Sequence, residues 1–443
     1  MRIKEIYRGN TAPKDTDLMW IRGKEILLFT NGGWVNVNES TVVDTELDPT
    51  SNHPIANSAV ASSLDDLEDA INETLGQAET QLSETSDNLI KNKAVYNQYI
   101  TDSEIIDICE TIDPDYMEHL KLKSPLTFNF LTEGTFTIVG DSYYIRKTIE
   151  YSKDGGNWVS VTTGATPITI NVVPGTKVQL RGNNSSYCTY NSGNYYHMSF
   201  GGTATFNLFG NIMSLINKTN FQNLTTLTGD YAFASLFASS KVVSAENLAL
   251  PATTLSNQCY RGMFKDCVNL TNVVSVLPAK TATLKCYQQM YLHCTGLTQI
   301  RCNIDLENTA TDCCNAMFSG CTNVTNTYQY SELNKLKLKS SVVQTTAYAS
   351  MFDQCSSLTM SPEILADTVN SYGCSSMFYS CSSLRTIYCK ATTFSADSFS
   401  NWVYGVPVAG GMAGYNFYKH HDADWGYGVN AIPQGWQEKN NWF

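Results

Sequence analysis

A short motif, Met or Leu followed by an aromatic residue, recurs through the second half of the chain and limits its fold more than any other feature. Five of the six copies carry a Cys three residues after the aromatic, and an apolar residue follows three positions later. A period of about 20–30 residues with the same pattern of apolar residues in each unit is typical of a solenoid. In a solenoid, neighbouring units cover one another's apolar faces. At intervals of 27, 27, 27, 34 and 26 residues, the copies begin at Leu236, Met263, Met290, Met317, Met351 and Met377.

Each unit is predicted to contain a short helix and a strand. From Tyr260 to Leu270, apolar residues recur at i, i+3, i+4, i+7 and i+10, a spacing that places them on one face of a helix. The next segment, TNVVSVLPA (271–279), has the composition of a strand. The predicted repeat core is Met263, Phe264, Cys267, Met290, Tyr291, Cys294, Met317, Phe318, Cys321, Met351, Phe352, Cys355, Met377, Phe378 and Cys381.

The chain has 14 cysteines, and three interpretations of them compete. Zinc sites commonly use about four converging ligands with short spacings, whereas pairs such as Cys259 and Cys267 lie eight or seven positions apart. A disulfide within one unit is disfavoured, because residues i and i+7 of a helix are about 10 Å apart, but bridges between units stay possible. Ser240 and Tyr348 stand where other units have Cys, which a ligand set would not tolerate. The pattern favours free thiols acting as small buried apolar residues, with no metal and no cofactor.

The composition disfavours some classes of partner. The formal net charge is −12, and nucleic-acid binding requires clustered Lys and Arg, so nucleic acid is not an expected partner. No run approaches the roughly 18 apolar residues that span a bilayer, so membrane insertion is not expected. The first ten residues, MRIKEIYRGN, lack an apolar core segment, which predicts synthesis in a cytoplasm without Sec-type export.

The sequence has no GxSxG, HExxH, P-loop or GxGxxG motif in a strand–helix setting. The chain is therefore not predicted to be an enzyme. The densest polar cluster is HHDAD (420–424), where liganding residues could hold a metal. Two adjacent His residues point in different directions on a regular backbone, which favours a solvated loop. The acidic run at 65–69 is interpreted as the solvated face of a helix.

Two parts of the chain read as β structure outside the repeats. Short apolar runs within LMWIRGKEILLFTNGGWVNV (18–37), separated by Gly-containing turns, predict a small β-meander with Trp20 and Trp34 in its core. Seven strand-like runs between Leu126 and Phe209, at a spacing of about ten residues, predict a β-sandwich.

Between these β regions a polar joint (48–63) leads into a helical pattern. Its apolar residues are spaced 3, 4, 4, 3 and 4 apart and form one narrow stripe, which a lone helix cannot bury. Self-association into a coiled-coil stalk would bury it, and an amphipathic helix packed on its own chain is the alternative. The predicted trimerisation residues are Leu64, Leu67, Ile71, Leu75 and Leu82.

Several stretches of the repeat region resemble a known family. NLALPATTLSNQCYRGMFKDCVNLTNV (247–273), CYQQMYLHCTGLTQI (286–300) and CSSMFYSCSSLRTIYC (374–389) closely resemble the leucine-rich repeats of BspA-type surface antigens, known from Bacteroides-like bacteria and their phages. Together with the β-rich segment before it, the resemblance covers about 124–437. The 34-residue step before Met351 departs from the pattern and puts strict stacking there in question.

The N-terminal third resembles a different family. DPTSNHPIANSAVASSL (48–64) resembles a joint that recurs in phage fibre proteins, and RGNTAPKDTDLMWIRGKEILLFTNGGWV (8–35) resembles the head of virion fibre proteins from gut phages. The resemblance implies a structural fibre of a phage virion, head or tail, that mediates adhesion to the host surface. Its expected partners are two further copies of itself, other virion proteins bound through Trp20 and Trp34, and a host glycan or protein.

On this interpretation the fold is mainly β with repeats. It comprises a virion-anchoring β-meander (1–44), a joint and trimeric helical stalk (45–95), a helical connector (96–123), a β-sandwich (124–209), an α/β leucine-rich-repeat solenoid (210–392) and a C-terminal capping region (393–443). Made in the host cytoplasm, the protein is expected on the surface of the phage particle.

Aromatic residues near the C-terminus are predicted to contact the receptor, because rings with polar tips stack on sugars and anchor interfaces. The alternative role for the same residues is to cap the core of the last repeat. Two other functions stay open, a bacterial cell-surface adhesin and a virion-borne polysaccharide depolymerase. The receptor-binding candidates are Trp402, Tyr404, Trp425 and Tyr427.

Overall fold

The chain is mainly β and divides into two compact units, residues 1–119 and 120–443. Its structure is a computed structural model. The residues that it describes are 5–8, 18–22, 25–30, 33–36, 116–140, 143–330, 334–408 and 414–440.

A four-stranded sheet forms the first part of the first unit. Three of its strands, β2 to β4, follow one another as an antiparallel meander, as the sequence predicts. The fourth strand, β1, pairs in parallel with β2 and was not predicted. The strands are β1 (Glu5–Arg8), β2 (Leu18–Arg22), β3 (Glu25–Thr30) and β4 (Gly33–Asn36).

Several predictions for the N-terminal third fall outside the described residues. These are the joint and stalk, most of the helical connector, and the side chains of Trp20 and Trp34. The predicted trimerisation residues Leu64, Leu67, Ile71, Leu75 and Leu82 belong to this group.

Helix α4 (Tyr116–Lys123) leads into the sandwich. Lys121 and Lys123 lie in its last turn, where cations interact favourably with the helix dipole. The helix ends before Pro125, because proline lacks the amide hydrogen that a further helical turn needs. The Lys121 side chain is buried, with Nζ 3.5 Å from Ser275 Oγ of the repeat region.

Two facing sheets make up the predicted sandwich. One has the order β15-β14-β5-β10-β7-β8 and the other β13-β6-β9, while β11 and β12 form a separate hairpin. All seven predicted strands are present, and β11, β12 and β13 are additional. The strands are β5 (Leu126–Phe130), β6 (Gly134–Val139), β7 (Thr148–Lys153), β8 (Val159–Thr162), β9 (Ile168–Val172), β10 (Lys177–Gly182), β11 (Cys188–Asn191), β12 (Asn194–His197), β13 (Ser199–Gly202) and β14 (Phe206–Asn211).

The core between the two sheets is aromatic. The ring of Phe128 lies 4.6 Å from Phe136 and 4.9 Å from Phe200, both of which belong to the smaller sheet. Phe206 of the same sheet as Phe128 is 5.0 Å away. Edge-to-face and tilted contacts of this kind add to the burial of each ring.

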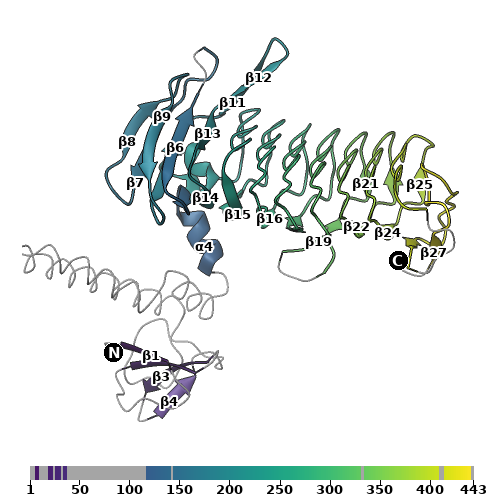
Figure 1. Ribbon diagram of the computed structural model, residues 1–443, viewed down its shortest axis with the longest axis horizontal. Coiled ribbons are helices and arrows are strands. Elements are labelled where there is room, and N and C mark those ends of the chain that lie inside the picture. Colours follow the sequence, from purple (N-terminus) through teal and green to yellow (C-terminus); the bar gives the residue numbers. More distant parts are fainter. Residues whose placement is uncertain are drawn as a thin grey trace, which may run out of the picture. The chain divides into compact units, whose positions relative to one another are not determined.

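The sandwich and the repeats are structurally continuous. Strand β15 (Val242–Ala249) belongs to the first repeat, yet it pairs in parallel with β14 and extends the six-stranded sheet. The ring of Phe237, also in the first repeat, lies 5.4 Å from Phe200 of the sandwich. Figure 1 shows the sheet leading directly into the stacked coils. The predicted boundary at residue 209 therefore falls inside one continuous core.

The helix predicted within each repeat unit is wrong. Residues 258–267 form a series of tight turns in which Gln258, Gly262 and Asp266 have positive φ angles of 57–59°. A left-handed residue at every fourth position is incompatible with an α-helix. It still brings the apolar residues at i, i+3, i+4 and i+7 to one side, which is why the spacing resembled that of a helix.

Hydrogen bonds between units stabilise the turns that contain these left-handed residues. The amides of Met263 and Cys267 donate within their own turn, to the carbonyls three residues before them. The amides of Tyr260, Gly262 and Phe264 donate instead to carbonyls of the next unit, at 2.8–3.0 Å. Alternate amides thus form a parallel ladder, which satisfies buried backbone groups that a single unit could not.

A column of aromatic rings runs through the centre of the repeats. The rings of Phe237, Phe264, Tyr291 and Phe318 follow one another at 5.2–5.3 Å with interplanar angles of 2–11°. Phe352 and Phe378 continue the column at 5.5 and 5.9 Å. All fifteen side chains of the predicted repeat core are fully buried.

The 34-residue step does not interrupt this stacking. Phe318 and Phe352, on either side of it, are stacked at 5.5 Å, and the Phe318 amide donates to the Met351 carbonyl at 2.9 Å. Tyr328 and Lys335, which flank part of the extra sequence, form an antiparallel bridge. The aromatic column is therefore continuous across the longer step.

Short parallel strands line the repeats and end in a five-stranded sheet, order β20-β22-β24-β26-β27. Two 3-10 helices, η1 (Ile212–Leu215) and η2 (Phe221–Asn223), precede the first repeat. The strands are β16 (Val276–Leu277), β17 (Gln299–Arg301), β18 (Asn303–Ile304), β19 (Asn326–Tyr328), β20 (Lys337–Leu338), β21 (Val342–Val343), β22 (Met360–Ile364), β23 (Thr368–Val369), β24 (Thr386–Cys389), β25 (Thr393–Phe394), β26 (Asn416–Lys419) and β27 (Gln437–Lys439).

The thirteen described cysteines are free and buried. In each repeat the Cys after the aromatic directs its thiol at the aromatic residue's carbonyl in the preceding unit. Cys267 Sγ lies 2.9 Å from the Phe237 carbonyl oxygen, and Cys321 Sγ lies 3.2 Å from that of Tyr291. The repeated thiol therefore acts as a buried hydrogen-bond donor between units as well as a small apolar group.

We expect these thiols to be unreactive in the native protein, because all thirteen are buried from solvent. Burial raises the pKa of Cys321 to about 12, so almost no thiolate, the reactive form, exists near neutral pH. Titration with a thiol reagent at pH 8 should detect the thirteen only after denaturation without reductant. Disulfides found under those conditions would contradict the assignment of free core thiols.

Candidate functional site

The four predicted receptor-binding residues divide into two pairs. Trp402 and Trp425 are buried, so their prediction as receptor contacts is wrong. Trp402 occupies the Met position of the last unit, where its carbonyl accepts the Phe378 amide at 2.8 Å. Its indole Nε1 donates to the Ala431 carbonyl at 2.8 Å, and its ring lies 5.5 Å from that of Trp425. Both tryptophans close the end of the repeat core.

Tyr404 and Tyr427 are exposed, by 49% and 52%. The ring of Tyr404 stacks at 4.9 Å on Tyr379 of the preceding unit. The Tyr427 hydroxyl donates to Glu438 Oε1 at 2.7 Å, and this hydrogen bond to a carboxylate raises the pKa of Tyr427. These contacts hold both exposed rings in place, where they can contact a ligand.

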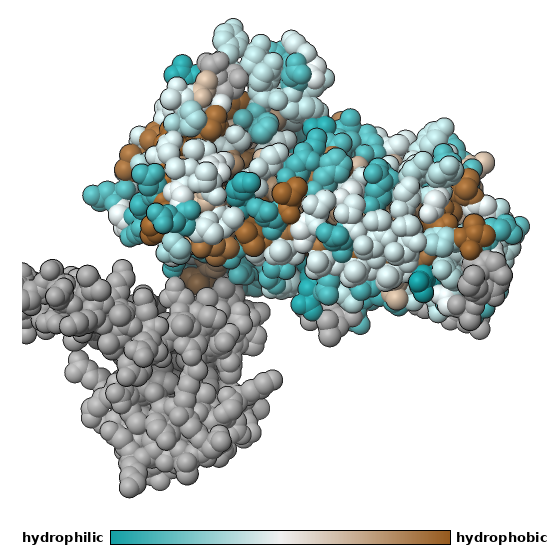
Figure 2. Space-filling view, in the orientation of Figure 1, coloured by the Kyte–Doolittle hydropathy of each residue, from teal (hydrophilic) through white to brown (hydrophobic). Residues whose placement is uncertain are grey.

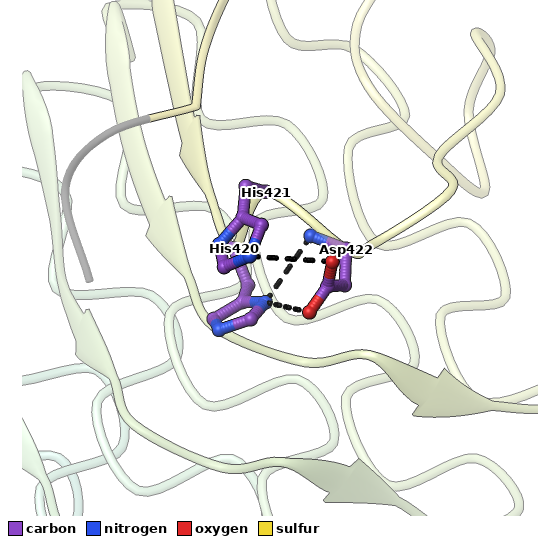
Figure 3. A group of neighbouring side chains, drawn as sticks. All are labelled: His420, His421 and Asp422. Carbon is purple, nitrogen blue, oxygen red and sulfur yellow. Dashed lines mark hydrogen bonds and ion pairs between the residues drawn. The ribbon is translucent and has the colours of Figure 1, made fainter.

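His420, His421 and Asp422 form a compact polar cluster beside β26 (Figure 3). The two imidazole rings stack at 4.4 Å, so the expectation that adjacent His side chains diverge is wrong. The chain makes a turn at this point, and a turn does not impose the alternation of a strand. Asp422 carboxylate oxygens lie 3.7 Å from His420 Nδ1 and 3.3 Å from His421 Nε2.

These distances are compatible with a divalent transition metal, whose tetrahedral nitrogen and oxygen ligands lie about 3.3 Å apart. His420 Nδ1 already accepts the Asp422 amide at 3.2 Å, and a metal would have to replace that hydrogen bond. Among the described residues this is the one group of three such ligands found close together. Its surroundings are open, since His421 and Asp422 are exposed.

A second aromatic surface, which the sequence analysis did not single out, lies on the β11–β12 hairpin. We call it the tyrosine patch. The hairpin turns at Ser192 and Gly193, both with positive φ, the conformation that two-residue hairpin loops favour. The signal in the sequence was the concentration of tyrosines in SSYCTYNSGNYYH (185–197). The patch consists of Tyr143, Tyr144, Tyr190, Tyr195, Tyr196 and Tyr231.

Charged groups on the outer surface of the repeats are often paired. Lys280 lies 3.1 Å from Glu307, Lys390 lies 2.8 Å from Asp367, and Lys339 is similarly paired with Asp305. Figure 2 shows that polar and weakly hydropathic residues predominate over the visible face of the repeats. This surface suits contacts through hydrogen bonds and rings more than through net charge.

Within the described residues, no helix is long and apolar enough to cross a bilayer. No family model, curated protein or solved structure matches the chain.

Proposed function

We propose that this chain is a structural fibre of a phage virion that projects from the particle and attaches it to the host cell surface. The observation that carries the proposal is the continuity between the sandwich and the repeats. Strands β14 and β15 pair directly, and the aromatic contacts run from Phe128 through Phe237 to Phe378. One uninterrupted core makes a rigid body that can hold a binding surface away from its point of attachment.

The repeats of this body are, in our proposal, a leucine-rich-repeat solenoid of the BspA type. Support comes from the parallel pairing of successive units and from their common Met, aromatic and Cys core. Solenoids offer broad surfaces, and their units contribute to stability through nearest neighbours. Adhesion is the function best suited to such a surface.

The N-terminal third would supply assembly. The narrow apolar stripe from Leu64 to Leu82 would form a homotrimeric coiled coil, and the N-terminal sheet would bind other virion proteins through Trp20 and Trp34. Three copies would present three binding surfaces at one end, which raises avidity without new contacts. The binding surfaces would lie on the exposed rings, among them Tyr404 and Tyr427.

Adsorption of the phage provides the test. Pre-incubating host cells with the purified full chain should reduce phage adsorption by about tenfold or more at saturating concentration, because three linked sites compete with the virion. Labelling of virions with antibodies against the chain should place it on the head or the tail. Undiminished adsorption together with unlabelled virions would contradict the proposal. Shortening of the host polysaccharide by the protein would favour a depolymerase instead.

A further inference from the structure

The tyrosine patch brings together rings from three separate segments. Tyr143 and Tyr144 come from the segment before β7. Tyr190, Tyr195 and Tyr196 lie on the β11–β12 hairpin, and Tyr231 belongs to the first repeat. Tyr144 lies 4.9 Å from Tyr143 and 4.1 Å from Tyr196. Tyr190 lies 4.8 Å from Tyr195 across the hairpin. Figure 1 shows this hairpin projecting from the body of the unit.

Polar contacts fix the base of the patch to the repeats. The Tyr195 hydroxyl donates to Gln258 Oε1 at 2.9 Å, and Gln258 Nε2 donates to the Tyr231 hydroxyl at 3.1 Å. The Arg261 guanidinium lies 4.0 Å above the Tyr195 ring, and its Nε donates to Gln288 Oε1 at 2.9 Å. A ligand that binds the outer rings would meet a surface already ordered, which lowers the entropy cost of binding.

The outer rings are exposed on both faces of the hairpin. Tyr143 is 81% exposed, Tyr190 49% and Tyr144 37%. Because side chains alternate along a strand, Tyr195 and Tyr196 lie on opposite faces, each with its own tyrosine neighbours. A flat protein surface could cover one face only. A flexible chain-like ligand could contact both.

The exposed area of the patch is also too small for a stable protein interface. At roughly 200 Å² for a whole tyrosine, the three exposed rings offer on the order of 300 Å². A stable protein interface needs about 800 Å² from each partner. Small ligands that combine an apolar face with hydroxyl groups fit better, since a ring packs against the face while tyrosine hydroxyls bond the rim.

We propose that the tyrosine patch binds a neutral polysaccharide of the host cell envelope. Sugar rings present C–H faces that an aromatic ring attracts through its negative π-face, and hydroxyls that pair with tyrosine and amide groups. The net charge of −12 disfavours an acidic polymer at long range. The proposal rests on the proposed attachment function and names the ligand class of that attachment.

The test uses the full chain, labelled with a fluorophore, and intact host cells. Tyr143→Ala combined with Tyr190→Ala should weaken binding to cells by about tenfold, because exposed aromatic anchors dominate small interfaces. Tyr372→Ala is the matched control, since Tyr372 is 47% exposed, close to the 49% of Tyr190, and lies outside the tyrosine patch. Conversion of Tyr143 and Tyr190 to Phe should restore most of the binding, because the rings are kept.

The chemistry of the ligand is tested on the cells themselves. Periodate, which cleaves sugars with adjacent hydroxyls, should abolish binding of the wild-type chain, whereas protease treatment of the cells should leave it. Neutral polysaccharide purified from the cells should compete, and the acidic fraction should not. Binding lost after protease, competition by the acidic fraction alone, or equal binding by the Tyr143→Ala, Tyr190→Ala variant would overturn the proposal while leaving host attachment intact. A wild-type chain that does not bind cells at all would overturn both.

Discussion

Phe318→Ala is expected to lower the free energy of unfolding by about 3–5 kcal/mol, the usual cost of truncating a buried phenylalanine. Phe318 stands in the middle of the aromatic column, 5.3 Å from Tyr291 and 5.5 Å from Phe352. Its removal leaves a cavity beside the rings of both neighbouring units, which stack directly on Phe318. Because repeat stacks are stabilised by neighbouring interfaces, we expect the unfolding transition to split as well as shift.

Urea unfolding followed by circular dichroism measures this effect. Thr311→Ala is the control, because Thr311 is exposed and lies in the same series of turns as Phe318. It should change the free energy of unfolding by less than about 0.5 kcal/mol. A Phe318→Ala protein as stable as the control would mean that the aromatic column does not hold the units together.

The combination of Ile71→Asp and Leu75→Asp is expected to convert a trimer into a monomer. Both residues belong to the predicted apolar stripe, and two charges in each of three helices would have to be buried side by side. Light scattering should then report a mass near 49.1 kDa for the variant and about three times that for the wild type.

The matched control adds the same two charges on the polar side of the predicted helix. Asn72→Asp with Gln77→Glu should leave the trimer intact, because these positions lie outside the stripe. A wild-type chain that is monomeric at micromolar concentration would contradict the stalk. Dissociation of both variants would instead indicate that total charge, and not the stripe, controls assembly.

The two predictions depend on different levels of information. The stripe is a property of the sequence alone, since its residues lie outside the described structure. The aromatic column was visible in the sequence as a period, because identical stacked units need the same side chain at the same place. The S–H donor role of Cys267 and its equivalents was not visible, since it depends on a carbonyl that belongs to another unit.

The predicted helix shows where a periodic pattern becomes ambiguous. Apolar residues at i, i+3, i+4 and i+7 line one side of an α-helix, and they also line one side of a series of four-residue turns. The choice between the two depends on the amide partners. Tyr260 and Phe264 bond to the next unit, and no single unit contains that information.

The C-terminal aromatics show a second limit. Trp402, Tyr404, Trp425 and Tyr427 form a similar pattern in the sequence, yet two are buried and two are exposed. Trp402 occupies the Met position of the last unit and is buried. Tyr404 follows two positions later, and its side chain is exposed. The tyrosine patch was likewise hidden, because its rings come from segments up to 88 residues apart, from Tyr143 to Tyr231.

The sequence by itself determined the period of the repeats, the identity of their core residues and the seven principal strands of the sandwich. These features follow from the spacing of apolar and polar residues within short stretches of the chain, which the sequence shows directly. Only the tertiary structure decided the turn conformation of the units, the continuity of β14 with β15 and the clustering of the tyrosines. Each of these depends on hydrogen bonds or ring contacts between residues that are distant in sequence, and such partners are chosen when the whole core forms.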